Sequence, residues 1–349
     1  MVRFGVIGAG HIGKRHAEMI ERNADAQLVG IADSRAKELL DIEKYQVPFY
    51  SNLESLLAGP EFDVLCVATP NGLHASHALA GLEAKKHVVI EKPMGLSRAE
   101  CENVIHKAMT VHKMVFCVMQ NRYSPPSEWI KSIIDQGILG KIFMVQVNCY
   151  WNRDDRYYKK GGWKGSQKLD GGTLFTQFSH FIDIMYWLFG DVSDIKATFA
   201  DFNHSGLTEF EDSGTVNFRF VNGGLGCINY STGVWDTNFE SSLTVIAENG
   251  TIKIGGQYMN EVEYCHIKNY TMPQLPPANP ANDYGPYKGS AANHNYIFDN
   301  VVDAITQGGM PTTNAMEGLK VVEIIENIYK QNPFLKSKSG ALEGVLQTR

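Results

Sequence analysis

Two side chains of this sequence are suited to moving a proton. Lys92 follows the apolar segment 87–90 and Glu91, and Pro93 comes directly after it. A proline restricts the backbone of the preceding residue, which suits a lysine that has to be aimed. His180 lies in an apolar segment, and an imidazole with an unperturbed pKa of about 6.5 can exchange protons at neutral pH. The alternatives without catalysis are that Lys92 is a surface residue paired with Glu91 and that His180 has a structural role.

The segment around His180 predicts a helix from Gly172 to Phe189 that glycines bound on both sides. At 100° per residue its polar side chains share a sector of about 120°. These side chains are Thr173, Thr176, Gln177, His180 and Asp183. Because a buried and isolated carboxylate is costly, the polar stripe indicates a polar cavity. The alternative is a structural pair of His180 with Asp183, one turn further on.

The first residues carry a dinucleotide-binding pattern. The apolar run 3–7 predicts a strand, and Gly8-Ala9-Gly10-His11-Ile12-Gly13 leads from it into the helical spacing of 14–22. In this pattern the first glycine allows a tight turn, the second lets the backbone approach a diphosphate, and the third lets helix and strand pack closely. The helix N-terminus then offers N–H groups to the phosphates.

A carboxylate at the end of the next strand indicates which dinucleotide is bound. The strand predicted for 27–32 ends at Asp33, placed to accept hydrogen bonds from the adenosine ribose and to repel a 2′-phosphate. NAD is therefore favoured over NADP. Arg35 could pair with such a phosphate, and Asp33 could instead cap the next helix.

Predicted strands at 63–68, 87–90 and 115–119 alternate with helical segments. This alternation predicts an α/β Rossmann domain with a doubly wound parallel sheet, whose ligands lie beyond the carboxyl ends of the strands. The cofactor-binding residues expected in the turn and at this edge are Gly8, Gly10, His11, Ile12, Gly13, Asp33, Ser34, Arg35, Thr69, Pro70, Asn71, His74, Glu91, Lys92 and Gln120.

The pattern changes near residue 142. Further strands are expected at 143–150, 195–201, 212–221, 225–231, 240–248 and 250–254, with hairpin turns at Asn222-Gly223 and Asn249-Gly250. They predict an α+β domain with a large, mostly antiparallel open sheet, covered by the helix of His180. We therefore expect a dinucleotide-binding domain at 1–122 and a substrate-binding and oligomerisation domain at 123–349. The last helix, expected at 314–330, could pack back on the first domain.

Two loops of the second domain stand out. Residues 151–168 hold six Lys and Arg (Arg153, Arg156, Lys159, Lys160, Lys164 and Lys168) against two Asp, with four aromatic residues between them. This mixture suits a phosphorylated or carboxylated ligand, although a solvated basic loop is an equal alternative. The proline-rich segment 268–293 is typical of a lid, an oligomer arm or a linker.

Composition excludes several classes of function. A net charge of −6 argues against general binding to nucleic acid or a membrane surface. The six cysteines are scattered without a CxxC pair, which fits reduced thiols in a cytoplasm. The glycine-rich N-terminus is unlike a signal peptide or a membrane span. His74 and His77 have no third metal ligand in sight, so no metal is expected.

These motifs together resemble the Gfo/Idh/MocA oxidoreductase family over essentially the whole chain. The glycine motif, Glu91-Lys92-Pro93 and His180-x-x-Asp183 carry the resemblance. The segments 120–122, 162–165, 170–172, 211–215 and 249–251 look like the branch that acts on UDP-N-acetylglucosaminuronic acid, a group of 3-dehydrogenases in surface-polysaccharide biosynthesis. One departure is Lys164 after Trp163, where an arginine is expected. Lysine keeps the charge but loses the bidentate geometry.

The resemblance implies Lys92 and His180 as the catalytic pair, with Asp183 orienting the imidazole, and adds Trp163 to the cofactor contacts. Oxidation of a secondary alcohol needs a base for the hydroxyl proton, and Lys92 and His180 both remain candidates for it. The substrate contacts that it implies are Lys92, Asn121, Arg122, Lys164, Asp170, Thr176, Gln177 and His180.

The implied function is NAD-dependent oxidation of a sugar hydroxyl, and a nucleotide sugar is the implied substrate. The alternatives are an inositol or free-sugar dehydrogenase of the same fold and, in another class, a non-catalytic regulator that senses NAD(P) or sugar. The family also implies a homodimer or homotetramer formed through the sheet of the second domain.

Overall fold

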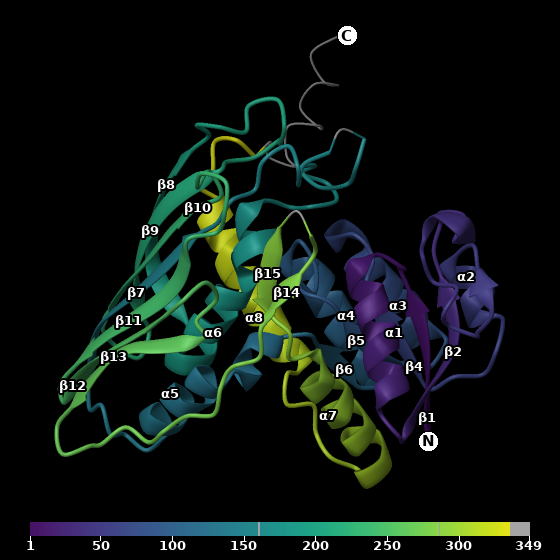
Figure 1. Cartoon of the computed structure of the whole chain (residues 1–349), viewed down its shortest axis with the longest axis horizontal. Helices are drawn as coiled ribbons and strands as arrows, with labels where there is room; N and C mark the ends of the chain where they lie inside the picture. The colour runs from purple at the N-terminus through teal and green to yellow at the C-terminus, as the bar shows by residue number, and fades with distance from the viewer. Residues whose placement is uncertain (160, 286, 336–349) are drawn as a thin grey trace.

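The computed structural model of the chain describes residues 1–159, 161–285 and 287–335. Two large sheets lie in two lobes, with helices between them (Figure 1). Lys160 of the predicted basic loop and residues 336–349 of the predicted second domain lie outside the described residues.

The first lobe is built on a six-stranded parallel sheet in the order β3-β2-β1-β4-β5-β6, which confirms the doubly wound sheet. The order reverses between β1 and β4, and ligands bind beyond the carboxyl ends of the strands at such a point. Its elements are β1 (Val2–Ile7), α1 (His11–Arg22), β2 (Ala26–Ala32), β3 (Phe49–Tyr50), α2 (Leu53–Leu57), β4 (Val64–Val67), α3 (His74–Glu83), β5 (His87–Ile90), α4 (Arg98–Thr110) and β6 (Val115–Cys117).

The second lobe holds a seven-stranded sheet in the order β13-β12-β11-β7-β10-β9-β8. β7 and β10 run parallel, and the other neighbours run antiparallel, which confirms the mostly antiparallel sheet. Its strands are β7 (Ile142–Tyr150), β8 (Val192–Ala200), β9 (Ser213–Phe220), β10 (Leu225–Ser231), β11 (Glu240–Ala247), β12 (Gly250–Gly255) and β13 (Glu261–Ile267).

Helices cover one face of this sheet, and they include the predicted helix of His180 (Figure 1). That helix begins as a π turn, η4 (Leu174–Phe178), and continues as α6 (Ser179–Phe189). The others are α5 (Pro125–Asp135) and α8 (Ala315–Tyr329), whereas α7 (His294–Gln307) packs on the first lobe. Within the proline-rich segment, β14 (Ala281–Asp283) and β15 (Lys288–Ala291) form a two-stranded sheet between the lobes (Figure 1).

Two helices late in the chain pack against the first lobe. α8 lies against α4 and β6, and α7 lies against α1 and β1. Phe298 of α7 contacts Phe4 of β1, with their ring centroids 5.8 Å apart. The core of the first lobe therefore includes residues from the end of the chain. Among the described residues, no helix is long and apolar enough to cross a membrane.

Candidate active site

The two residues proposed to move a proton come together where the lobes meet. Lys92 stands two residues after the end of β5, and its Nζ donates a hydrogen bond to the carbonyl oxygen of Thr176 at 2.7 Å. Thr176 lies in the π turn, where backbone hydrogen bonds shift from i+4 to i+5. His180 follows in the next turn and is close enough for the Lys92 charge to act on it.

Burial changes the protonation of both groups. It lowers the pKa of Lys92 to about 8, against the opposing charges of Glu91 and Asp170. Burial also holds the pKa of His180 well below its usual value, and the Lys92 charge adds to this. At neutral pH the imidazole is therefore uncharged, and a proton can leave Lys92 in a slightly alkaline range.

His180 has unused hydrogen-bonding capacity. Its Nε2 lies 3.2 Å from Nε2 of Gln120, and the side chain is only 3% exposed. Within the described part of the chain, Nδ1 of His180 and Oε1 of Gln120 have no partner, and neither does the amide nitrogen of Asn121. Buried polar groups in native proteins are nearly always paired, so these atoms have capacity for a ligand or a water as partner.

Asp183 has a partner other than the expected one. Its two carboxylate oxygens accept hydrogen bonds from Nη2 and Nε of Arg122 at 2.6 and 2.9 Å. Arg122 also donates to Glu317 at 2.7 Å. No hydrogen bond joins Asp183 to His180 among the described residues, and the bidentate guanidinium is the partner that this structure gives the carboxylate, so an orienting role of Asp183 stays a prediction. Arg122, a predicted substrate contact, is 4% exposed and is neutralised by these two carboxylates.

Asp170 ties the two lobes together beside Lys92. Its carboxylate accepts from the backbone N–H of Gly165 at 2.8 Å and from the hydroxyl of Thr176. The side-chain amide of Asn71, which follows β4, donates to the Asp170 carbonyl at 2.8 Å and to the Thr176 hydroxyl at 2.7 Å. Burial raises the pKa of Asp170 to about 6. Asn71 was predicted to bind cofactor, and this structure shows it bridging the lobes.

A cluster of cations and tyrosines lies on the other side of Gln177, and we call it the cationic cage (Arg153, Tyr157, Lys164 and Tyr287). Arg153 is 2% exposed and donates to Oε1 of Gln177 at 2.7 Å. Lys164 donates to the Tyr287 hydroxyl at 3.0 Å and lies 3.7 Å from the Tyr157 ring centroid. Burial lowers the pKa of Lys164 to about 8.

Arg153 forms no salt bridge with any carboxylate of the described residues. Its other hydrogen bonds go to the carbonyls of Asn152 and Lys288 and to the Asn238 side chain. Its guanidinium also lies over the rings of Trp151, Tyr157 and Tyr287. Sequence reasoning placed Arg153 in the basic loop but not among the site residues, although an arginine between aromatic residues was the available signal.

The glycine motif has the geometry that a diphosphate needs. Gly8 has φ +93°, and a side chain at Gly13 would stand 1.7 Å from the Gly8 carbonyl oxygen. Beyond Gly10, by contrast, a side chain would meet nothing within 4 Å. The turn is thus closed on its inner side and open toward the expected phosphates, at the N-terminus of α1.

Asp33 lies at the end of β2, as predicted. It accepts hydrogen bonds from the Ala9 N–H at 2.8 Å and from the Arg35 guanidinium at 2.9 and 2.8 Å. Burial opposes ionisation, but the bonds from Arg35 and Ala9 lower the pKa of Asp33, so a carboxylate faces the ribose position. Ser34 and His11 are exposed beside this edge, and Ile12 is partly buried.

Two other predicted cofactor contacts, His74 and Glu91, have hydrogen-bond partners within the chain. The ring nitrogens of His74 lie 2.7 Å from the carbonyl oxygens of Pro93 and Thr69. Glu91 pairs with His16, as described below. Pro70 is partly buried after β4, and Trp163 is partly buried in the basic loop. Contact of these residues with the cofactor stays a prediction.

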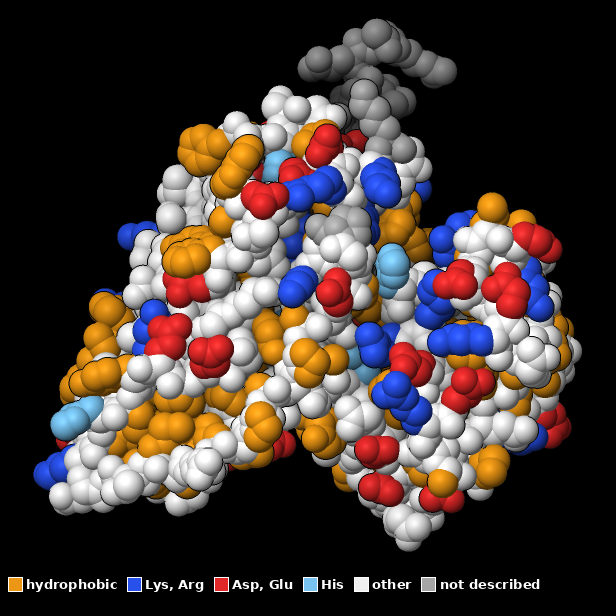
Figure 2. All heavy atoms as spheres, viewed as in Figure 1, with side chains coloured by type: hydrophobic (Ala, Val, Ile, Leu, Met, Phe, Trp, Pro, Cys, Tyr) orange, Lys and Arg blue, Asp and Glu red, His pale blue; other side chains and the backbone are white. Residues whose placement is uncertain are grey.

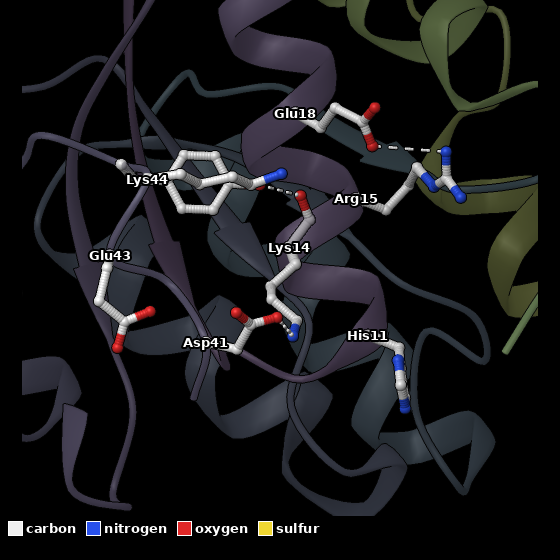
Figure 3. A pocket seen from close by; sticks show the side chains of 8 residues that line it. His11, Lys14, Arg15, Glu18, Asp41, Glu43 and Lys44 are labelled. Atoms are coloured by element: carbon white, nitrogen blue, oxygen red, sulfur yellow. Dashed lines mark hydrogen bonds and ion pairs between the residues drawn. The ribbon is translucent and has the colours of Figure 1, made fainter. Parts of the chain in front are cut away.

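A hollow of about 370 Å³ adjoins the glycine turn on the outer side of α1 (Figure 3). Its lining residues are His11, Lys14, Arg15, Glu18, Asp41, Glu43, Lys44 and Tyr45. Lys14 pairs with Asp41 at 3.3 Å, and Arg15 pairs with Glu18 at 3.4 Å (Figure 3). Because these charges neutralise one another, the surroundings of Lys92 are a better candidate for the catalytic site than this hollow. No three His, Cys, Asp or Glu side chains of the described ranges gather where they could hold a metal ion.

Both lobes match models of known protein families. Residues 2–119 match the model "Oxidoreductase family, NAD-binding Rossmann fold", and residues 128–253 match the GFO/IDH/MocA C-terminal domain. Myo-inositol 2-dehydrogenase of Thermotoga maritima is 28% identical over 248 residues, which cover 66% of this chain and 68% of the relative.

Two solved structures are similar along nearly the whole chain. The WlbA dehydrogenase of Bordetella pertussis, in complex with NADH and UDP-GlcNAcA, is 31% identical with a TM-score of 0.83, covering 94% of this chain and 95% of that chain. The WlbA dehydrogenase of Chromobacterium violaceum, also with NADH and UDP-GlcNAcA, is 28% identical with a TM-score of 0.84, covering 94% and 93%. The chain therefore belongs to the Gfo/Idh/MocA family of oxidoreductases, and its first lobe is an NAD-binding Rossmann fold.

Proposed function

We propose that this protein is an NAD-dependent dehydrogenase that oxidises the 3-hydroxyl of UDP-N-acetylglucosaminuronate (UDP-GlcNAcA) to a ketone. The observation that carries the proposal is the cationic cage, whose Arg153 is buried and has no neutralising carboxylate among the described residues. A buried charge is expensive unless it is paired, and a ligand carboxylate or phosphate would supply the missing charge. The two WlbA relatives, which bind UDP-GlcNAcA, support this substrate class.

The residues of the chain divide the chemistry between them. The glycine turn and Asp33 would hold NAD, which would supply the hydride acceptor for the carbinol carbon. Lys92 has a pKa of about 8, so its neutral form is accessible to take the hydroxyl proton, and its charged form can stabilise an alkoxide. The uncharged His180 offers a second nitrogen for the same proton. The network of Asp170, Thr176 and Asn71 holds the π turn opposite Lys92.

We also propose that two copies pair through the open face of the seven-stranded sheet. Met144 of β7 stands in register with Leu225 of β10 and Ile246 of β11. These three apolar side chains are 43%, 43% and 41% exposed. Figure 2 shows apolar side chains exposed over this lobe. Replacing Met144 and Ile246 by Lys should convert a dimer or tetramer into smaller species in light scattering. A wild-type that is already monomeric would contradict this pairing.

The substrate proposal is tested by NADH formation with UDP-GlcNAcA, its uncharged parent UDP-N-acetylglucosamine and myo-inositol. We expect turnover of UDP-GlcNAcA and at least tenfold weaker use of the uncharged sugar. Activity on inositol alone would contradict the proposed substrate and favour the alternative, an inositol dehydrogenase. Tight NAD binding with no turnover of any polyol would favour a sensor.

The same assay tests the catalytic pair. Lys92→Met and His180→Ala should each lower kcat by about 10²–10⁴-fold, the usual contribution of a positioned acid or base. NADH affinity, measured by fluorescence titration, should change little. The exposed Lys268→Ala serves as the matched control and should keep the wild-type rate. A wild-type rate in either site variant would contradict the assignment.

A further inference from the structure

A buried hydrogen-bonded pair, His16 and Glu91, lies directly behind Lys92. The Glu91 carboxylate is 2.9 Å from Nε2 of His16, which belongs to α1, and both residues are almost fully buried. The other carboxylate oxygen of Glu91 accepts the backbone N–H of Lys92 at 3.2 Å. One carboxylate thus connects the helix that follows the glycine turn with the lysine at the active site.

His16 is fixed in place from the opposite side. Its ring meets Phe298 of α7 edge-on, with centroids 5.1 Å apart, and its exposed fraction is 0%. The His294 ring lies 6.2 Å from it, and Nε2 of His294 is 3.9 Å from Glu91. Burial lowers the pKa of His294 to about 4, so this second imidazole is uncharged.

Glu91 remains a carboxylate in this setting. Burial alone would raise its pKa, but the His16 hydrogen bond and the positive charges around it lower the pKa to about 2. The titratable groups within electrostatic reach of Glu91 are His16, Cys66, His74, Lys92, Tyr284 and His294. His16 makes the hydrogen bond that secures the ionised form.

Glu91 is in turn the largest influence that favours the charged form of Lys92. Burial works against that charge, and so does Arg153, whereas Glu91 and Asp170 support it. The other titratable groups within electrostatic reach of Lys92 are His74, His180 and His294. Removing the Glu91 charge would leave Asp170 as the remaining carboxylate acting on this lysine.

We propose that His16 and Glu91 are positioning residues for Lys92: His16 holds Glu91 ionised, and the Glu91 carboxylate fixes both the backbone and the ammonium charge of Lys92. The inference rests on the proposed function only for its effect on turnover. The arrangement also connects the active-site lysine with α1, the helix that follows the glycine turn.

The test measures Lys92 itself, in the full chain and without substrate. Competitive acetylation with limiting acetic anhydride across pH 6–11, followed by peptide mass spectrometry, gives the titration of this one amine. Glu91→Gln, which keeps the shape, should move the Lys92 midpoint down by about one unit, the usual size of a nearby opposite charge. His16→Leu should move it in the same direction, because the buried Glu91 then takes up a proton. His16→Gln keeps an N–H donor and should restore most of the wild-type midpoint.

His87→Gln is the control, since this partly buried histidine stands at the other end of β5 and should leave the midpoint unchanged. If Glu91→Gln leaves the midpoint of the Lys92 titration unchanged, the proposal is wrong. Because this variant is isosteric, it tests the proposal even if His16→Leu does not fold. The pH profile of kcat should move with the midpoint. A moved midpoint with an unmoved profile supports the inference and contradicts the proposed role of Lys92 in the reaction.

Discussion

Two buried arginines, Arg122 and Arg153, have opposite surroundings. Arg122 is 4% exposed and is neutralised by Asp183 and Glu317. Arg153 is 2% exposed, and its partners are amides, carbonyl oxygens and aromatic rings. The carboxylates raise the pKa of Arg122, against its burial, whereas burial lowers the pKa of Arg153.

The difference separates a structural charge from a ligand-binding charge. Arg122 follows β6, and its partners come from α6 and α8, so its ion pairs join three elements and are complete within the chain. Arg153 is held in position by neutral groups that orient the guanidinium without cancelling its charge. The proposed substrate would supply the missing counter-charge, and the following predictions test this division between the two arginines.

The largest effect is expected from removing the Arg122 counter-charge. Asp183→Ala leaves a buried guanidinium with one remaining partner, and breaking such a pair costs about 3–5 kcal/mol. The free energy of unfolding, measured in urea, should fall by that amount. The control Asp135→Ala breaks an exposed pair with Lys131 and should cost below about 1 kcal/mol. Equal losses in the two variants would show that the Arg122 pair is not the structural element described here.

Arg153→Met should have the converse result. Stability should be kept or increased, because an unpaired buried charge is replaced by an apolar side chain of similar length. The KM for UDP-GlcNAcA should rise by a factor equivalent to about 1.5–3 kcal/mol, the usual value of a hydrogen bond to a charged group. The KM for an uncharged sugar substrate should stay unchanged. Loss of stability with retained affinity would reverse the assignment of the two arginines.

This pair of arginines also marks the limit of sequence reasoning. The strand–helix alternation, the glycine turn and the polar stripe from Thr173 to Asp183 depend on local spacing, so they were predictable. The partner of Asp183 was not, because Arg122 stands 61 residues away and reaches it only after the lobes pack together. The same holds for Arg153, whose cage is completed by Tyr287 from the segment that sequence left as lid, arm or linker.

A third arginine lies between the two extremes. Arg35 pairs with Asp33, but its side chain is 53% exposed, at the position expected for the adenosine ribose. Asp33→Ala frees this guanidinium and removes the repulsion of a 2′-phosphate. The ratio of NAD to NADP affinity should fall by about tenfold, or about 1.4 kcal/mol. Fluorescence titration with NADH and NADPH measures both constants, and an unchanged ratio would place the preference elsewhere in the loop.

The smallest effect concerns the second cation of the cage, Lys164. Because its pKa is about 8, it is charged below pH 8 and loses its charge as the pH rises above that value. The affinity for UDP-GlcNAcA in the presence of NADH should therefore fall by about fivefold between pH 7 and 9, which corresponds to about 1 kcal/mol. Lys164→Arg stays charged over this range and should flatten that part of the decline. Calorimetric titration at both pH values separates this effect from Lys92, which titrates in the same range in both proteins. If the decline is equally steep in Lys164→Arg, Arg153 alone pairs with the negative charge of the substrate. The cage then has one binding cation rather than two.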